Sequence, residues 1–317
     1  MKILVTGGAG FIGSHVVDEY LLRDYEVIVI DNLSTGCYEN LNPRCRFIEL
    51  DIREKEKVAQ ILKMEKPDYV NHHAAQTSVV NSVRDPLNDA EINILATLNL
   101  LECSYREKVK KFIFASSGGT IYGELSQSPR EDFPLTPFSP YGVSKAAIEF
   151  YLAFYLRSHG LKYVSLRYAN VYGPRQDPTG EAGVIAIFTR QMLEKKTPTI
   201  FGDGETVRDY VYCADVARAN LLAIKKEAVG VYNVGTGIGT TVNDIYQLIA
   251  QATKFQGSPR YDHPRAGDLR RSILEVEKIQ RELGWEPQIF LPEGINKTVE
   301  YFQTQIPAKK EKKDCPS

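Results

Sequence analysis

The chain has 317 residues, a length that predicts one large domain or two closely associated domains around a substantial core. Its 39 Lys and Arg residues balance 40 Asp and Glu residues, and the net charge of −1 excludes nucleic acid and an acidic membrane surface as expected partners. With 43% hydrophobic and 25% charged residues, the composition is that of a globular protein, neither disordered nor fibrous.

The N-terminal part of the chain alternates short apolar runs with longer amphipathic ones. Strands are predicted over residues 3–5, 26–30, 69–71 and 112–115, with a helix over 14–23 between the first two. Such alternation is typical of α/β proteins in which crossover helices connect parallel strands. We therefore predict an α/β fold with a Rossmann-type, doubly wound parallel sheet. The start lacks the basic and apolar stretches of a signal peptide, and no later run could span a bilayer, so we expect a cytoplasmic protein without membrane contacts.

A glycine-rich segment links the first strand to the first helix. The run Gly8-Ala9-Gly10-Phe11-Ile12-Gly13 matches the G-x-G-x-x-G pattern, and Gly7 adds a further glycine. Glycines let the backbone approach a pyrophosphate, whose charge the helix N-terminus stabilises. Asp31 follows Gly13 by 18 residues, where its carboxylate can accept hydrogen bonds from an adenosine ribose, which favours NAD over NADP. A tight turn that serves only strand–helix packing is the alternative.

Other polar residues in this half have less specific patterns. Asp51 follows the apolar run 47–50 and is either a contact to adenine or a surface carboxylate. The adjacent His72 and His73 point to opposite faces of a strand and have no third ligand nearby in sequence, so we expect structural histidines. The five cysteines form no C-x-x-C pair and leave one over, which indicates a reducing compartment and neither zinc nor a disulfide framework. No metal site is predicted.

Two long helices are predicted, over Asp89–Arg106 and Pro140–His159. The second has Ser139 as its N-cap, a proline at its first position and Gly160 after its end. Apolar residues lie all round this helix, so more than one of its faces must be covered. A second subunit is one candidate for that cover.

Tyr141 and Lys145 lie four residues apart on the second helix, which places them on one face within reach of a common ligand. The Lys145 ammonium favours the ionised phenol, and a nicotinamide cation would add to this effect, so Tyr141 is a candidate general base. The alternative is an aromatic core residue beside a solvated lysine, since the chain has 18 tyrosines. The dinucleotide pattern makes the catalytic interpretation the preferred one.

After about residue 170, loops rich in Gly and Pro interrupt the pattern, as in regions that bind ligands. Helical patterns return over 242–252 and 292–302, which predicts a smaller C-terminal α/β substrate lobe. We expect residues 1–170 to form the NAD-binding domain, to which the chain crosses back later, and residues 171–307 to form mainly the substrate lobe. Residues 308–317 are charged and lack apolar periodicity, as in a solvated tail.

Several motifs together resemble the extended short-chain dehydrogenase/reductase superfamily and, within it, the NAD-dependent epimerase/dehydratase family. They are the glycine pattern, the Tyr-x-x-x-Lys pair and the segments 116–123, 167–174, 207–210, 233–237 and 265–268. The resemblance extends from Met1 to about Phe302. It implies NAD as the cofactor and a UDP-sugar as the substrate.

The resemblance also implies which residues contact these molecules. For NAD, the matching positions are Gly7, Gly10, Phe11, Ile12, Gly13, Asp31, Asn32, Asp51, Ile52, Ala74, Asn93, Tyr141, Lys145 and Tyr168. For the UDP-sugar, they are Thr120, Asn170, Val184, Thr199, Phe201, Arg208, Arg265, Asp268 and Ser272. The two arginines can neutralise a diphosphate, and Asp268 can accept hydrogen bonds from ribose hydroxyls. Without the resemblance, each arginine would be read as a member of a surface ion pair.

One position departs from the pattern of the family. Where these enzymes carry a serine or threonine that hydrogen-bonds the reacting hydroxyl, this chain has Gly118. Ser116, Ser117 and Thr120 are the candidate replacements, and we expect Ser117 and Thr120 to act with Tyr141 and Lys145. Sugar-nucleotide 4,6-dehydratases of the superfamily carry an Asp-Glu pair there to drive elimination. Because this chain has two glycines instead, we do not expect a dehydratase.

The resemblance implies an isomerase that interconverts UDP-glucose and UDP-galactose through a 4-keto sugar, with no net oxidation. Ser272 falls on the position that governs room for an N-acetyl group, so its small side chain predicts that UDP-N-acetylhexosamines are also accepted. A homodimer is implied if the helices over 89–106 and 140–159 pair with their copies as a four-helix bundle; alternatively, both only cover the sheet. Other candidates are a UDP-glucuronate 4-epimerase or decarboxylase and a non-catalytic NAD-binding regulator.

Overall fold

A seven-stranded sheet forms the centre of the fold. The computed structural model describes residues 1–179, 183–264 and 269–305. The strand order is β10-β6-β5-β4-β1-β2-β3, and every neighbouring pair is parallel, so the predicted Rossmann-type sheet is confirmed. The strands are β1 (Lys2–Thr6), β2 (Glu26–Asp31), β3 (Arg46–Glu49), β4 (Tyr69–His72), β5 (Lys111–Ser117), β6 (Lys162–Tyr168) and β10 (Gly230–Val234). The chain reverses its direction of travel across the sheet between β1 and β4, the point where doubly wound folds bind ligands.

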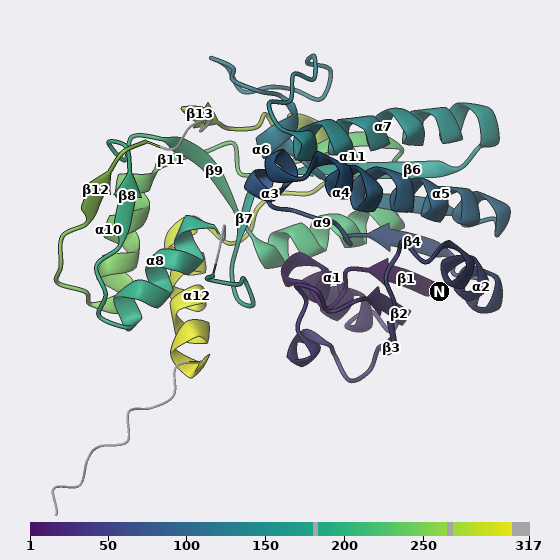
Figure 1. The fold of residues 1–317 in the computed structure, drawn as a ribbon, viewed down its shortest axis with the longest axis horizontal. Coiled ribbons are helices and arrows are strands. Elements are labelled where there is room, and N and C mark those ends of the chain that lie inside the picture. The colour runs from purple at the N-terminus through teal and green to yellow at the C-terminus, as the bar shows by residue number, and fades with distance from the viewer. Residues whose placement is uncertain (180–182, 265–268, 306–317) are drawn as a thin grey trace, which may run out of the picture.

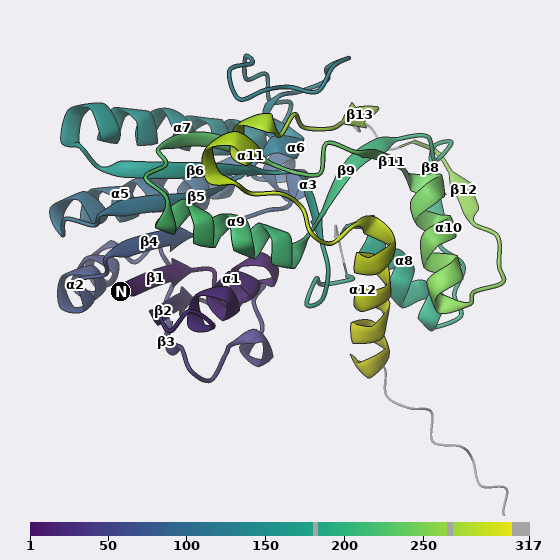
Figure 2. The same cartoon turned by 180° about the vertical axis from the view of Figure 1, so that it is seen from behind.

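Helices cover both faces of this sheet (Figures 1 and 2). On one face lie α2 (Lys55–Glu65), α5 (Thr97–Arg106) and α7 (Pro140–His159), and on the other lie α1 (Phe11–Leu21), α9 (Cys213–Lys225) and α11 (Glu277–Leu283). Successive side chains of β1 enter opposite cores, since Ile3 packs in one cluster and Leu4 in the other. Burial on both faces explains why the strands are nearly continuous runs of apolar residues.

The helix predicted from Asp89 begins earlier and is not uniform. It comprises α4 (Pro86–Ala90), a π-helical segment η2 (Glu91–Ala96) and α5, after a separate helix α3 (Val79–Arg84). The start was predicted too late because Asp85 caps it, its side chain accepting a hydrogen bond from the Asn88 backbone N–H at 3.1 Å. The helix α7 has the predicted ends, with Ser139 Oγ accepting from Gly142 N at 3.1 Å.

A smaller lobe stands beside the carboxyl ends of the strands (Figure 1). Its helices are α8 (Val184–Leu193), α10 (Val242–Thr253) and α12 (Leu291–Gln305), which pack around their own apolar cluster. Its strands are β7 (Asn170–Tyr172), β8 (Thr199–Phe201), β9 (Val207–Tyr212), β11 (Gly239–Thr241), β12 (Arg260–Asp262) and β13 (Arg271–Ser272). The short segments η1 (Tyr38–Asn40) and α6 (Gly118–Ile121) complete the elements of the described ranges. Every helix in those ranges is too short or too polar to traverse a lipid bilayer.

Candidate active site

The glycine-rich loop connects β1 to α1 at the carboxyl edge of the sheet. Gly7 has a φ of +71° and donates its N–H to Ile30 O at 2.8 Å, while Gly10 donates to Gly7 O at 3.2 Å. A Cβ on Gly13 would lie 2.1 Å from Gly7 O, so the loop closes tightly only because no side chain stands there. This arrangement leaves the backbone N–H groups at the start of α1 directed to one open edge.

Asp31 at the end of β2 holds the glycine loop from the side. Its carboxylate is buried and accepts from Ala9 N at 3.0 Å and from Leu33 N at 2.9 Å. Asp51 is half-buried: the Arg53 side chain hydrogen-bonds to it and lowers its pKa to about 2, and Asn32 donates to it at 2.8 Å. Asp51 is thus anionic at neutral pH. The two acids lie at the ends of the adjacent strands β2 and β3, where a ribose and a base would be held.

The loop after β4 borders the glycine loop on its other side. Ala74 N donates to Thr6 Oγ1 at 3.3 Å, and a Cβ on Gly7 would lie 2.5 Å from Ala74 N. His72 is buried between two hydroxyls, with Thr6 Oγ1 2.6 Å from Nδ1 and Thr97 Oγ1 2.8 Å from Nε2. His73 stacks on Tyr168 at 6.2 Å between ring centroids and an interplanar angle of 14°. His72 is therefore hydrogen-bonded within the core, whereas His73 is half-buried and stacked, and its Nε2 has no hydrogen-bond partner among the described residues.

Tyr141 and Lys145 lie side by side in the first turns of α7. The Lys145 ammonium is 5.7 Å from the centroid of the Tyr141 ring and 4.8 Å from that of Phe114. It donates to Ala115 O at 2.9 Å, which fixes it against β5, and only 4% of the residue is exposed. The phenol of Tyr141 has a hydrogen bond with the Ser117 side chain. The predicted pair is thus brought to the carboxyl end of β5, together with one of the two predicted hydroxyls.

Burial changes the proton equilibria of this pair in opposite directions. It raises the pKa of Tyr141 to about 12, against the effect of the Ser117 hydrogen bond. It lowers the pKa of Lys145 to about 8, although the charges of Asp89 and Glu149 oppose that fall. At pH 7 the pair therefore consists of a neutral phenol beside an ammonium ion. Further positive charge near Tyr141 would be needed to make its phenolate accessible.

The end of β5 and the short helix α6 carry the three candidate replacements for the hydroxyl missing at Gly118. Among the described residues, Ser116 Oγ and Thr120 Oγ1 are buried and have no hydrogen-bond partner. A Cβ on Gly118 would lie 2.5 Å from Leu274 Cδ1, so the Leu274 side chain occupies the space that a side chain at position 118 would need. Thr120 Oγ1 can therefore form a hydrogen bond with a ligand, whereas the Ser117 side chain already has a hydrogen bond with Tyr141.

The structure brings several predicted substrate residues to the small lobe. Ser272 on β13 is the register partner of Arg208 on β9, so two residues 64 positions apart in the chain are neighbours. Asn170 lies close to the β5 turn, since a Cβ on Gly119 would be 3.8 Å from Asn170 Oδ1. Val184 begins α8, and Thr199 and Phe201 are the ends of β8. Arg265 and Asp268 lie outside the described residues.

Of the remaining predicted NAD positions, Phe11 and Ile12 are half-buried at the start of α1, and Ile52, Asn93 and Tyr168 are buried. Tyr168 ends β6 opposite Ser117 of β5, and its hydroxyl donates to Asn220 Oδ1 at 3.2 Å. Asn93 is hydrogen-bonded within the protein: its Nδ2 donates to Gln76 O and its Oδ1 accepts from Gln76 N, both at 2.9 Å. A contact between Asn93 and a dinucleotide would therefore use the second lone pair of Oδ1.

One buried network near the site was not anticipated from the sequence. Arg167 donates from Nε and Nη2 to the carboxylate of Glu149, and from Nη1 to Tyr122 Oη at 2.5 Å. Tyr122 Oη donates to Asn233 Oδ1 at 2.8 Å. Glu149 follows Lys145 by four residues and therefore lies on the same, buried side of α7. This charged residue on a buried helix face is the sequence feature from which the network could have been predicted.

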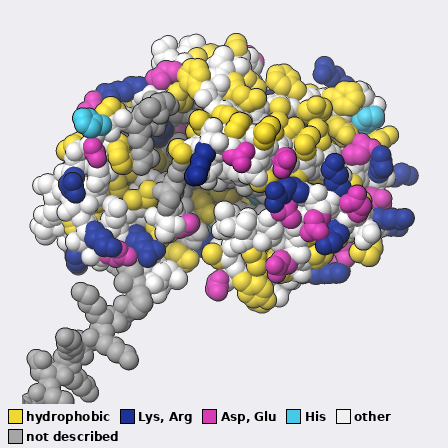
Figure 3. Space-filling view, in the orientation of Figure 1, with side chains coloured by type: hydrophobic (Ala, Val, Ile, Leu, Met, Phe, Trp, Pro, Cys, Tyr) yellow, Lys and Arg dark blue, Asp and Glu magenta, His cyan; other side chains and the backbone are white. Residues whose placement is uncertain are grey.

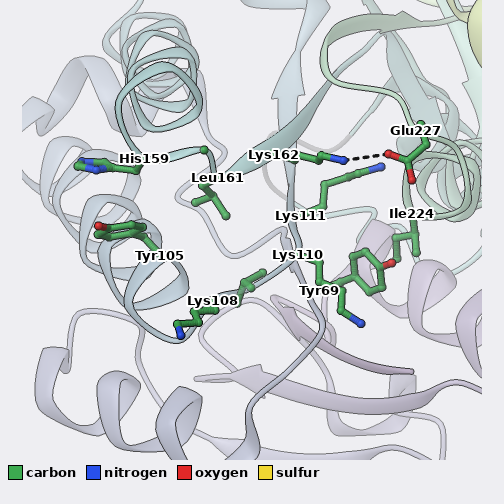
Figure 4. A pocket seen from close by; sticks show the side chains of 12 residues that line it. Tyr69, Tyr105, Lys108, Lys110, Lys111, His159, Leu161, Lys162, Ile224 and Glu227 are labelled. Atoms are coloured by element: carbon green, nitrogen blue, oxygen red, sulfur yellow. Dashed lines mark hydrogen bonds and ion pairs between the residues drawn. The ribbon is translucent and has the colours of Figure 1, made fainter.

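A second pocket, of about 500 Å³, lies at the opposite edge of the sheet (Figure 4). Tyr69, Lys111 and Lys162, the first residues of β4, β5 and β6, line it. Three of the four lysines that line it have partners: Lys162 pairs with Glu227 at 3.0 Å, Lys110 pairs with Asp68 at 2.6 Å, and Lys111 donates to Ala223 O at 2.8 Å. Helix C-termini meet here, so the lysines compensate carbonyl charge and the pocket is a poor candidate for a substrate site.

The residues at the carboxyl edge fit a dinucleotide. The glycines leave room that Cβ atoms would fill, the first turn of α1 has no acidic residue, and the carboxyl group of Asp31 lies beside the loop. The molecular surface is hollowed between the sheet and the small lobe next to this edge (Figure 3). The positions of the loop, the Tyr141–Lys145 pair and the small lobe therefore support a shared site for a dinucleotide and a second ligand.

Comparisons with known proteins agree with this geometry. The model of the NAD dependent epimerase/dehydratase family matches residues 3–235. The UDP-glucose 4-epimerase of Mycolicibacterium smegmatis is 43% identical over 312 residues, which cover 96% of this chain and 99% of the relative. The structure of UDP-glucose 4-epimerase with UDP-glucose from Thermotoga maritima is 55% identical with a TM-score of 0.95, covering 96% of this chain and 99% of that one. The Thermus thermophilus UDP-glucose 4-epimerase complex with NAD is 48% identical with a TM-score of 0.92, covering 96% and 100%. The chain belongs to the NAD dependent epimerase/dehydratase family.

Proposed function

We propose that the chain is an isomerase that interconverts UDP-glucose and UDP-galactose by NAD-dependent epimerisation at C4 of the sugar. The observation that carries this proposal is that Tyr141, Lys145 and Ser117 come together at the carboxyl end of β5, on the same edge of the sheet as the glycine loop. The adjacent Gly118-Gly119 lacks the acid pair that a dehydratase needs. The relatives described above as UDP-glucose 4-epimerases support the same activity.

We assign the two ligands to the two parts of the fold. We assign the NAD contacts to the glycine loop, Asp31, Asp51 and their neighbours within residues 1–170. The UDP-sugar contacts are assigned to the small lobe within residues 171–307, where Arg208 and Ser272 are adjacent. Strong contacts to the nucleotide and weak ones to the hexose would let the sugar turn over while it stays bound.

The proton is handled by Tyr141. When bound, NAD would supply a reversible hydride acceptor for C4 and the positive charge of its oxidised nicotinamide ring. Tyr141 Oη would take the proton of the sugar 4-hydroxyl as the C4 hydride leaves to the cofactor, which gives a 4-keto sugar. It would return the proton once the sugar has rotated and C4 has taken the hydride back on its other face. Lys145, fixed by its bond to Ala115 O, favours the phenolate electrostatically, and the Ser117 hydroxyl stabilises the same oxygen.

The test of this function is conversion of UDP-galactose, followed by proton NMR of the anomeric sugar signals with and without added NAD. Appearance of UDP-glucose is the expected result, and activity without added NAD would show that the protein retains its cofactor. Turnover of UDP-glucuronate alone would instead identify an enzyme of carboxylated sugars. If NAD binds and none of these substrates reacts, the chain is a non-catalytic binder.

Thr120→Val tests the role of the unpartnered hydroxyl. Valine has nearly the same shape, and Thr120 Oγ1 has no hydrogen-bond partner among the described residues, so stability should hardly change. A lost hydrogen bond to the reacting sugar should lower kcat about tenfold. Ser116→Ala, which removes another buried hydroxyl without a described partner, is the matched control and should leave kcat nearly unchanged. Equal effects of the two variants would remove Thr120 from the mechanism.

Ser272 is proposed to set the room for an N-acetyl group. It is half-buried and lies against Arg208 through the pairing of β13 with β9. Ser272→Tyr should abolish turnover of UDP-N-acetylgalactosamine, because the larger ring fills this space, while turnover of UDP-galactose continues. The measurement is the ratio of kcat/KM for the two substrates in each protein. An unchanged ratio would contradict the assignment.

We further propose that two copies associate through the outer faces of α5 and α7. Exposed apolar side chains gather over these helices and α3 and α4 (Figure 3). On α7, Val143, Phe150 and Phe154 follow a spacing of seven and four residues, which is typical of helix–helix seams. A neighbouring pocket of about 450 Å³ is lined mainly by proline and apolar residues, including Phe138 and Ile94. A second copy of the same two helices would bury this face as a four-helix bundle.

Phe150→Asp is expected to convert the dimer into a monomer. The side chain is 68% exposed in the single chain, so the change should not disturb the fold, but a carboxylate would be buried in the seam. Sedimentation velocity measures the outcome. Met64→Asp on α2, where the methionine is 70% exposed and away from α7, is the control and should leave the dimer intact. A wild-type monomer at micromolar concentration would overturn the proposal.

A further inference from the structure

A buried carboxylate with only neutral partners lies against the start of α7. Asp89 has no exposed surface; its Oδ1 accepts from Gln76 Nε2 at 2.8 Å and from Asn93 Nδ2 at 2.9 Å, and Ser144 Oγ donates to Oδ2 at 2.6 Å. Within the described part of the chain, no Lys, Arg or His forms an ion pair with Asp89. All three partners donate to the carboxylate, and hydrogen-bond donors are the partners that a carboxylate group accepts.

The position of Asp89 relates it to the catalytic pair. Ser144, which it binds, directly precedes Lys145 and follows Tyr141 by three residues on the same helix. The π-helical segment η2 begins two residues after Asp89, and its wider turn carries Asn93 to the same carboxylate. Asp89 therefore joins the first turns of α7 to the loop after β4 through Gln76 and Asn93.

The other charges around Lys145 are paired or absent. Glu149 on α7 forms its ion pair with Arg167 of β6, at 2.5 Å between Nη2 and Oε2. Burial lowers the pKa of His73 to about 3 and that of His72 well below its usual range, so both rings at the end of β4 are neutral. Among the charges that oppose the fall in the pKa of Lys145, Asp89 has the larger effect and Glu149 the smaller. Asp89 is thus the main uncompensated charge on the pair.

We propose that Asp89 is a positioning residue for the reaction, whose hydrogen bonds hold the first turns of α7 in register with the loop after β4 and whose buried carboxylate acts on Lys145 beside Tyr141. The catalytic consequence rests on the proposed function. The effect of Asp89 on Lys145 does not, because it depends only on residues of this chain. Asp89 needs no contact with substrate or cofactor for this role.

Asp89→Asn removes the charge and keeps the shape. The ammonium of Lys145 then loses a favourable interaction, so its pKa should fall by roughly one unit from about 8. The phenolate of Tyr141 loses an unfavourable interaction with the same charge, so the pKa of Tyr141 should fall as well. The acidic limb of the kcat/KM profile should therefore also move to lower pH. A residue with only a structural role would lower kcat/KM at every pH and would leave both limbs in place.

Ser144→Ala is the matched control, because it removes one hydrogen bond and leaves the carboxylate. We expect both limbs of its kcat/KM profile to stay at the wild-type pH values, while kcat/KM itself falls at every pH because α7 loses its bond to Asp89. The activity-independent readout is the titration of Lys145 in protein labelled with 15N-lysine, in which a lysine titrating near pH 8 stands apart from those near 10.5. An unmoved Lys145 titration in Asp89→Asn, or an equal shift in Ser144→Ala, would overturn the proposal even if the chain is not an epimerase.

If Asp89→Asn does not fold, the double variant Asp89→Ser with Ser144→Asp, in which the two side chains exchange places, is used for the same titration. It retains the hydrogen-bonded pair but places the carboxylate on α7, next to Lys145. The Lys145 titration should then stay near pH 8 or move higher, and a fall below the wild-type value would contradict the electrostatic role. If UDP-sugar turnover is absent in the wild type but the lysine shifts as expected, the proposed function fails and the electrostatic assignment stands.

Discussion

Tyr141→Phe is expected to lower kcat for UDP-galactose about a thousandfold, while the affinity for NAD changes little. The phenol is the group placed to exchange a proton with the sugar, and its hydrogen bond with Ser117 holds it at the end of β5. Its pKa of about 12 shows that the protein alone does not make the phenolate common at pH 7. The acid–base role therefore depends on the surrounding positive charges, and removal of the hydroxyl cannot be compensated by them.

Two measurements separate catalysis from folding in this variant. The anomeric NMR assay gives kcat, and fluorescence of the reduced cofactor gives its affinity. Tyr25→Phe is the control, since Tyr25 lies in the turn between α1 and β2, at the other edge of the sheet. It should retain full activity. Turnover of Tyr141→Phe within threefold of the wild type would remove Tyr141 from the mechanism and require another proton acceptor.

Local patterns were sufficient to predict the parts of the site that are contiguous in the chain. The glycine run, the end of β2 at Asp31 and the capped start of α7 each depend on residues within one or two turns of one another. The four-residue spacing of Tyr141 and Lys145 becomes a spatial pair as soon as the helix forms. The alternation of strands and helices likewise determined the parallel sheet, because crossover connections admit few other arrangements.

Contacts that join distant segments were not accessible in this way. Nothing local relates Ser272 to Arg208, which become neighbours only when β13 pairs with β9. The π-helical turn of η2 has no sequence signature here, yet it places Asn93 on Asp89. Asp89 itself reads as an ordinary polar residue in an amphipathic helix, since its burial depends on how α4 packs against α7. Side-chain networks of this kind follow from tertiary packing.

The buried Arg167–Glu149 pair shows how strongly such a network affects stability. Only 3% of Arg167 and 5% of Glu149 are exposed, and Ser165 Oγ donates to Glu149 Oε1 at 2.9 Å. Removal of one partner leaves the other charge in a medium of low polarity. Arg167→Met should therefore reduce the free energy of unfolding by about 3–5 kcal/mol. The urea midpoint and the thermal midpoint at pH 7 measure this loss.

The double variant Arg167→Met with Glu149→Leu identifies the cause of that loss. If the cost arises from an unpaired buried carboxylate, replacing both groups by apolar side chains should restore most of the stability, since the desolvation penalty disappears with the charge. Arg44→Met, which breaks the exposed pair with Asp24, is the control and should cost less than about 1 kcal/mol. A double variant as unstable as Arg167→Met would show instead that the contacts of Arg167 with Tyr122 and Glu131 carry the effect.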